Sequence, residues 1–213
     1  MSVEETKSLF FTDGYATINE VFPIPVIDAA YLQAMRNFDE VNQVIDSKNL
    51  HFGIGIKNGF TEIVQRHSHR FEMSYHMDGS EFDFVLQNRS IRDAVSNILE
   101  CENFIIANRS LVVSRPGCTD QAWHSDGPHV SATQYLPCHV LNVFIPLVDV
   151  NIDNGPTEFR PGSQFYTRNL AKSMLIAKLK KQLRPVDAPC IKKGSILLVR
   201  QLYTHMFRWR KFC

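Results

Sequence analysis

The sequence predicts a single domain built mainly from β-strands, with helices flanking them. Three observations lead to this fold class. The chain has 213 residues, a length at which sandwiches and barrels commonly form one unit. Apolar, β-branched runs within 104–113, 140–148 and 195–199 are typical of buried strands. Two other segments, 27–45 and 91–99, carry apolar residues at helical spacing along one face.

The N-terminal part is expected to hold a short helix, a turn and an edge strand. Asp13 and Gly14 interrupt an apolar stretch, and the sequence alternates after them. Pro23 and Pro25 precede the long helix expected from about residue 27 to 45. Its apolar stripe should pack on a sheet.

Residues 47–62 contain three glycines and are expected to form a loop or irregular strand. Residues 63–86 are interpreted as a pocket wall or an exposed loop. Arg66 and Arg70 flank a His-x-His pair there, and two nearby cations disfavour a third. A role for this segment in holding an anionic substrate is the less favoured alternative.

Ser90 is expected to cap the helix over 91–99, with Asp93 three residues later. Core strands should follow at 104–107 and 111–113. Further on, 140–148 predicts a central strand. Lysines in 169–183 predict a helix with a solvated basic face, and a turn at Lys193-Gly194 should lead into the strand at 195–199.

Composition excludes several classes of protein. Hydrophobic residues make up 44% and charged residues 21%, as in an ordinary soluble protein. The net charge of +1 gives no reason to expect a nucleic acid or membrane partner. Five scattered cysteines favour reduced thiols over a disulfide framework. No apolar run approaches the ~20 residues of a membrane span and no signal peptide is visible, so a cytoplasmic protein is expected.

The chemistry is concentrated in one stretch, which begins Gln121-Ala-Trp-His-Ser-Asp-Gly-Pro-His129. Side chains two apart in a strand point to the same face, so His124 and Asp126 can reach one point in space. An imidazole and a carboxylate are two-thirds of the 2-His-1-carboxylate triad that binds non-heme Fe(II). By itself, a His-x-Asp pair is a weak signal, and a surface turn with a polar Ser-Asp-Gly is the favoured interpretation.

The wider stretch resembles the phytanoyl-CoA dioxygenase family. The resemblance rests on the His-x-Asp segment, the run Leu-Asn-Val-Phe-Ile-Pro-Leu-Val at 141–148, and Asn-Gly-Pro-Thr-Glu-Phe-Arg-Pro-Gly-Ser at 154–163. It is strongest over about 105–165, and weaker over 10–21 and 189–198.

This resemblance implies an Fe(II)- and 2-oxoglutarate-dependent oxygenase with a double-stranded β-helix (jelly-roll, cupin-like) core. Residues 1–213 would form one domain, expected to be incomplete at its C-terminal end. The implied reaction hydroxylates a C–H bond of a small organic or acyl substrate, consuming O2 and releasing succinate and CO2. Ascorbate would act as an additional reductant. The substrate and the oligomeric state are not readable from the sequence.

The resemblance also implies a second histidine and an arginine. In the family the histidine follows the glycine of a Gly-Ser-x-Leu-Leu strand by about eleven residues, which from Gly194 gives His205. An arginine beyond that histidine holds the distal carboxylate of 2-oxoglutarate. Here Arg208 and Arg210 follow His205, at other spacings than in the family.

Two alternatives follow for the C-terminal part. In one, His205 is the third ligand and Arg208 or Arg210 replaces the expected arginine. In the other, the chain departs from the family after about Val199, and His205 is in register by chance. The strict geometry of a bidentate arginine–carboxylate contact slightly favours the second.

Other residues have supporting roles in this hypothesis. Asn142 is the polar residue of an apolar strand, and either faces the cosubstrate pocket or is a core amide bonded to backbone. Gln121 and Trp123 flank the ligands and are expected to order their surroundings. His129 is a rival ligand, interpreted as a residue beside the metal ligands or facing the substrate.

Two other functions stay open. A catalytically dead binding module would keep the fold without binding 2-oxoglutarate, and calorimetry would separate it from the oxygenase. A zinc-type hydrolase would use His124, Asp126 and His129, and metal analysis would identify it. The hydrolase is the weaker alternative, because no strong general base is placed nearby.

Overall fold

The computed structural model describes residues 2–50, 53–74, 83–127, 137–165, 170–200 and 205–207. More of these residues lie in helices than in strands, so the structure is mixed α and β rather than mainly β. The helical elements are α1 (Val3–Asp13), α2 (Ile24–Ser47), η1 (Ile56–Asn58), α3 (Asp83–Leu86), α4 (Arg89–Leu99), η3 (Ser163–Phe165) and α5 (Leu170–Leu179). The strands are β1 (Tyr15–Ile18), β2 (Ile63–His67), β3 (Arg70–Ser74), β4 (Ser110–Ser114), β5 (Leu141–Phe144), β6 (Thr157–Phe159), β7 (Ile196–Arg200) and β8 (His205–Phe207).

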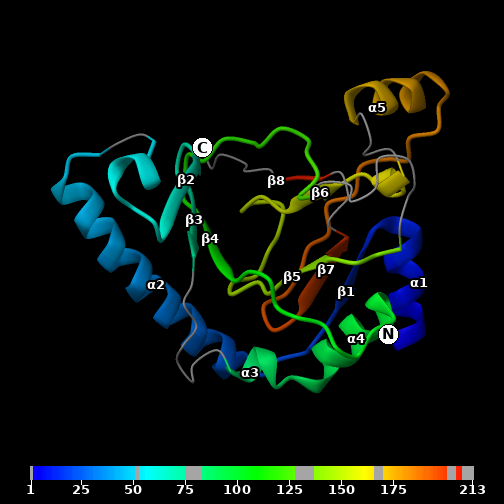
Figure 1. Ribbon diagram of the computed structural model, residues 1–213, viewed down its shortest axis with the longest axis horizontal. Helices are drawn as coiled ribbons and strands as arrows, with labels where there is room; N and C mark the ends of the chain where they lie inside the picture. The colour runs from blue at the N-terminus through cyan, green and yellow to red at the C-terminus, as the bar shows by residue number, and fades with distance from the viewer. Residues whose placement is uncertain are drawn as a thin grey trace.

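The strands form three small antiparallel sheets, ordered β1-β7-β5, β2-β3-β4 and β6-β8. In Figure 1 the long helix α2 runs along the side of the molecule that carries β2, β3 and β4, while α1 and α4 lie beyond β1. Within the described chain β7 is the middle strand of its sheet and β5 lies at one end. The prediction of a central strand at 140–148 was therefore wrong about its place in the sheet.

Three apolar clusters hold these layers together. The first packs one face of the β1-β7-β5 sheet on α1, α2 and α4; it includes Phe10, Ile27, Val95, Ile98, Ile196 and Leu198. The second joins α2 to the β2-β3-β4 sheet; it includes Phe38, Ile45, Ile63, Phe71 and Met73. The third covers the other face of the β1-β7-β5 sheet; it contains Phe159, Ile191, Leu197 and Val199. Both faces of β7 are thus covered, and all five of its residues are buried.

The helix ends follow ordinary capping chemistry. Ser2 and Glu5 form a reciprocal capping box at the start of α1, which ends at Gly14 with φ of 87°. Asn88, not Ser90, caps α4, because its Oδ1 accepts from the backbone N–H of Ile91 at 3.1 Å. Ser90 lies inside the helix, so that prediction was wrong by two residues.

Two further expectations differ from the structure. Residues 104–107 form no strand, and Ile105 is 87% exposed in the connection between α4 and β4. Their β-branched side chains have no facing sheet to pack on, and without one β-propensity does not make a strand. Residues 63–74, interpreted as a pocket wall or an exposed loop, form the β2–β3 hairpin, which turns at His69 with φ of 58°. The loop is therefore wrong, and the pocket wall stays a prediction.

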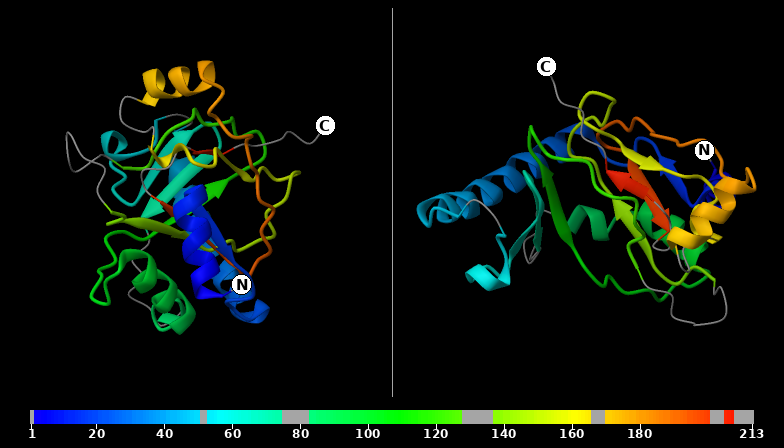
Figure 2. Two further views of the ribbon diagram at one scale, coloured as in Figure 1. Left: turned by 90° about the vertical axis from the view of Figure 1, so that its right-hand side faces the viewer. Right: turned by 90° about the horizontal axis from the view of Figure 1, so that it is seen from above.

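The N-terminal helix and edge strand, the helix α2 and the buried strand β7 are confirmed, with α2 extending to Ile24–Ser47. None of the described helices is both long and apolar enough to cross a membrane. Figure 2 shows α5 at the margin of the molecule in both further views.

Candidate metal centre

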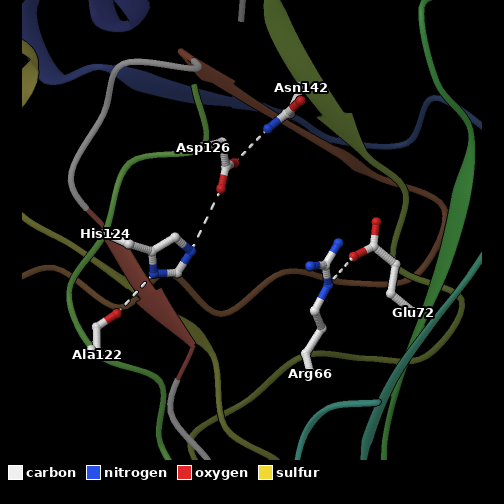
Figure 3. A network of polar contacts seen from close by, with 6 residues as sticks. All are labelled: Arg66, Glu72, Ala122, His124, Asp126 and Asn142. Carbon is white, nitrogen blue, oxygen red and sulfur yellow. Dashed lines mark hydrogen bonds and ion pairs between the residues drawn. The ribbon is translucent and has the colours of Figure 1, made fainter. Parts of the chain in front are cut away.

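His124 and Asp126 follow β4 after a turn in which Cys118 N–H donates to the Arg115 carbonyl at 3.1 Å. The segment from Gln121 to Gly127 is largely irregular, so the two side chains do not share the face of a regular strand. They meet nonetheless, with 3.5 Å between His124 Nε2 and Asp126 Oδ1 (Figure 3). Their side chains are 35% and 25% exposed, respectively, so the pair is partly shielded and still accessible.

A backbone carbonyl fixes the orientation of the His124 ring. Nδ1 lies 2.8 Å from the carbonyl oxygen of Ala122. Since that oxygen can only accept, Nδ1 carries the proton and donates it. In the neutral ring, Nε2 is then the atom with a free lone pair, and it faces Asp126. Metal-ligating histidines are typically held in this way.

Asn142 fixes the carboxylate of Asp126 from the sheet side. Its Nδ2 donates to Asp126 Oδ2 at 2.5 Å, leaving Oδ1 as the oxygen nearer His124. Asn142 lies on β5 opposite Val199 of β7, so it shares the sheet face of the third apolar cluster. This contact directs the amide N–H of Asn142 to a candidate metal ligand and not to backbone, and its predicted place beside the cosubstrate stays a prediction.

The facing atoms of the pair are both electron donors, so a positive charge between them is favoured. Hydrogen bonding to the Asp126 carboxylate accordingly raises the pKa of His124, against burial and the charge of Arg70, which lower it. A divalent cation satisfies both lone pairs in the same way. Two ligand atoms about 2.1 Å from a metal and at right angles lie roughly 3.0 Å apart, close to the separation seen here.

Arg70 brings a buried positive charge to the same region. It is the first residue of β3 and is 6% exposed. Its Nη1 donates to Ser114 Oγ at 3.3 Å. Burial lowers the pKa of Arg70, while Cys118, Glu72 and Asp126 raise it. The influence of Asp126 on Arg70, and of Arg70 on His124, means that the guanidinium lies within electrostatic reach of both candidate ligands.

The sequence signal for Arg70 was its position beside the His-x-His pair, and its burial was not foreseen. A second arginine of the same hairpin, Arg66, forms an ion pair with Glu72 at 2.7 Å and appears in the same close-up (Figure 3).

Trp123 connects the site to β6. The guanidinium of Arg160 lies over its ring, 5.0 Å from the centroid, and Arg160 Nη1 also donates to the Arg184 carbonyl at 3.4 Å. Stacking of this kind favours a fixed position for the indole. The neighbouring Gln121 has a buried Oε1 without a hydrogen-bond partner among the described residues. A buried acceptor of this kind suits a bound water or ligand donor.

His205 is the first residue of β8, and its backbone pairs with Phe159 of β6. Phe159 is buried and stacks on Tyr15 over the sheet face that also carries Asn142. Arg160, next to Phe159, contacts Trp123, next to His124. The chain segments of His124 and His205 are therefore linked through β6.

Other predicted site residues fall where the structure gives no description. The side chain of His205 and all of Arg208, Arg210 and His129 lie outside the described residues. Among the side chains that are described, no group of three His, Cys, Asp or Glu residues is placed to hold a metal ion. His124 and Asp126 are thus the described part of the predicted triad.

Solved structures of similar fold are known, while curated proteins gave no match. AviO1 from Streptomyces viridochromogenes Tue57 has a TM-score of 0.68 and 17% identity, over 98% of this chain and 88% of its own. The non-heme alpha ketoglutarate dependent carbocyclase SnoK from nogalamycin biosynthesis has a TM-score of 0.67 and 17% identity, over 100% and 81%. HygX from Streptomyces hygroscopicus, solved with nickel and 2-oxoglutarate, has a TM-score of 0.68 and 10% identity, over 100% and 83%.

At these identities the likeness is one of fold. The sequence itself matches a family over residues 10–206, which covers both the His-x-Asp segment and His205. The chain therefore belongs to the phytanoyl-CoA dioxygenase family.

Proposed function

We propose that this protein is an Fe(II)- and 2-oxoglutarate-dependent oxygenase that hydroxylates a C–H bond of a small organic or acyl substrate. O2 would be consumed, and succinate and CO2 released. The observation that carries the proposal is the His124–Asp126 pair, in which a ring nitrogen and a carboxylate oxygen face each other at 3.5 Å. Each of the two groups is oriented by a separate hydrogen bond, as expected of metal ligands.

The donor set suits this metal. In the proposal His124, Asp126 and His205 bind Fe(II) from one side, leaving positions open for cosubstrate and oxygen. When bound, the iron and 2-oxoglutarate supply the oxidising chemistry, and the protein supplies binding and orientation. The Ala122 carbonyl keeps Nε2 of His124 available, and Asn142 keeps Asp126 from turning away.

The charge of Arg70 supports this proposal in two ways. It opposes part of the rise that Asp126 causes in the pKa of His124, and this acts toward the neutral imidazole that a metal requires. It also gives the region a buried cation that can attract an anionic cosubstrate such as 2-oxoglutarate. Arg208 and Arg210 remain proposed contacts for the distal carboxylate, and Gln121 a proposed contact for a bound water or the cosubstrate.

The substrate class is proposed from relatives. HygX has been solved with hygromycin B, and the epimerase SnoN with Fe3+, alpha ketoglutarate and nogalamycin RO. The family name points to an acyl-CoA. These relatives include a carbocyclase and an epimerase as well, so hydroxylation is the part of the proposal that depends most on direct assay.

The test is succinate release with Fe(II), 2-oxoglutarate and O2, compared between the natural protein and His124→Ala. We expect slow release from the natural protein even without substrate, and none above background from the variant. His139→Ala is the matched control, because this histidine also bonds a backbone carbonyl two residues earlier but lies outside the site. Equal release from all three proteins would refute the proposal, and no succinate release together with no 2-oxoglutarate binding by calorimetry would identify the binding module instead.

A further inference from the structure

The outer face of α5 is apolar where a surface helix is normally polar. The helix lies at the margin of the molecule in all three views (Figures 1 and 2). Ala177 is 1% exposed and faces the body of the protein. Leu175, Ile176 and Leu179 are 59%, 40% and 75% exposed. At 100° per residue Leu175 and Leu179 point away from Ala177, and Ile176 lies to one side of them, about 100° from Ala177.

Lysines surround this apolar face and no acid accompanies them. Lys172, Lys178, Lys180 and Lys181 are all exposed. No Asp or Glu occurs between Glu158 and Asp187. Helical spacing places Lys172 on the same side as Leu179 and Ile176, toward the start of the helix, and Lys178 on one flank of the apolar face. Lys180 directly follows α5 and lies beyond the other flank. The net charge of +1, from which no membrane partner was expected, averages over the whole chain and hides this local excess.

We propose that α5 binds the surface of an anionic lipid bilayer. The helix would lie in the plane of the surface, with Leu175, Ile176 and Leu179 among the lipid headgroups and upper acyl chains. The four lysines would contact lipid phosphates and carboxylates around it. This inference goes beyond the proposed reaction and does not depend on it, since no residue of α5 belongs to the His124–Asp126 site.

A lipid surface fits this helix better than a protein partner does. A specific protein interface usually covers roughly 800 Å² on each partner. Ten residues of helix extend only about 15 Å, and three apolar side chains offer far less area. A bilayer needs no matching shape, because side chains enter it one by one. The four lysines form no ion pair with the described residues, and their positive charge also matches the charge of acidic headgroups.

The experiment is sedimentation of the full chain with two kinds of vesicle, one of phosphatidylcholine alone and one that also contains phosphatidylserine. We expect binding to the acidic vesicles, at least tenfold weaker binding to the neutral ones, and progressive release as NaCl screens the charges. The double variant Leu175→Ser with Leu179→Ser should lose at least tenfold in affinity, and Lys178→Glu with Lys180→Glu should lose a similar factor.

Matched controls use exposed residues elsewhere. Leu32→Ser with Ile56→Ser removes apolar side chains that are 57% and 81% exposed, and Lys57→Glu changes a lysine outside α5. Both should bind acidic vesicles as the natural protein does. Circular dichroism checks that each variant folds.

A reporter variant gives a second readout. Leu179→Trp should show a blue-shifted emission with acidic vesicles and quenching by brominated acyl chains. If the natural protein binds neither kind of vesicle, or if the controls lose as much affinity as the α5 variants, the lipid proposal is wrong. A protein partner would then be the remaining occupant of this face.

Discussion

The buried strand β7 and the irregular segment from Gln121 to Gly127 are joined through Asn142, yet they owe their order to different forces. β7 is hydrogen-bonded on both sides, to β1 and β5, and all of its residues are buried. The Gln121–Gly127 segment is partly exposed and is positioned by individual polar contacts of His124, Asp126 and Trp123. We therefore expect that removing one contact of β7 mainly lowers the stability of the protein. Removing one contact of the Gln121–Gly127 segment should mainly weaken metal binding.

The largest effect on stability is expected for Leu198→Ala in β7. Leu198 is fully buried in the first apolar cluster, and removing such a side chain leaves a cavity that costs about 2–5 kcal/mol. Urea unfolding measures the change. Leu32→Ala, at a 57% exposed position of α2, should stay within about 0.5 kcal/mol. Similar losses in the two variants would contradict the central place given to β7.

Gly194→Ala tests the turn that leads into β7. Gly194 has φ of 87°, and a Cβ built on it would lie 2.8 Å from the carbonyl oxygen of Phe22. The carbonyl oxygen of Gly194 also accepts a hydrogen bond from Phe22 N–H at 2.9 Å, so the backbone at Gly194 has little room to move. We expect a loss of about 2–4 kcal/mol in urea unfolding.

Gly59→Ala is the matched control for that substitution. Its φ is 84°, but nothing lies within 4 Å of its added Cβ. Only the backbone strain remains, about 1 kcal/mol. If the two alanine variants were equally stable, the close approach of Phe22 would not matter for the start of β7.

Asn142→Ala tests the polar contacts that position the Gln121–Gly127 segment. Losing the hydrogen bond to Asp126 should weaken Mn²⁺ or anaerobic Fe(II) binding about 10–100-fold, as for other residues that orient metal ligands. Stability should change by only about 1 kcal/mol, since the amide is not part of the apolar core. Calorimetric metal titration and urea unfolding give the two numbers. Asn97→Ala, which removes an exposed amide that bonds a helix carbonyl, should change neither by much.

The comparison also separates the features that could be predicted from the sequence from those that could not. The helix α2 and the strand β7 were predicted because their apolar periodicity is local, and burial follows from it. The approach of His124 to Asp126 was predicted too, although by a strand geometry that the irregular segment lacks. Positions two apart stay close enough that the pair can meet in either conformation.

Features that depend on distant partners were not predictable. Ile105 and Ile106 have strand composition, but no sheet lies opposite them, and both are exposed. Arg70 is buried with Ser114 Oγ accepting one of its N–H groups and with the carboxylates of Glu72 and Asp126 raising its pKa, and of these three residues Ser114 and Asp126 come from other parts of the chain. Asn88 and Ser90 are both good caps, and only the backbone conformation decides between them.

The smallest expected effect concerns how much the turn before β7 contributes to stability at acidic pH. Asp149 Oδ1 accepts from the backbone N–H of Lys193 at 3.0 Å, and its Oδ2 pairs with Lys192 at 2.9 Å. The Lys193 N–H, followed by the Lys192 ammonium, lowers the pKa of Asp149 from its ordinary value of 3.8. A lowered folded-state pKa gives stability that is fully present above the ordinary value and is lost as the pH falls through the folded one.

Asp149→Asn should therefore be slightly less stable than the natural protein near neutral pH, and the difference should shrink as the pH falls below 3.8. Thermal unfolding midpoints measured from neutral to acidic pH provide the measurement. Asp153→Asn, in the same exposed loop and without a lysine contact among those described, is the control for the loss of one surface carboxylate. A difference that grew in acid would mean that the carboxylate of Asp149 destabilises this turn.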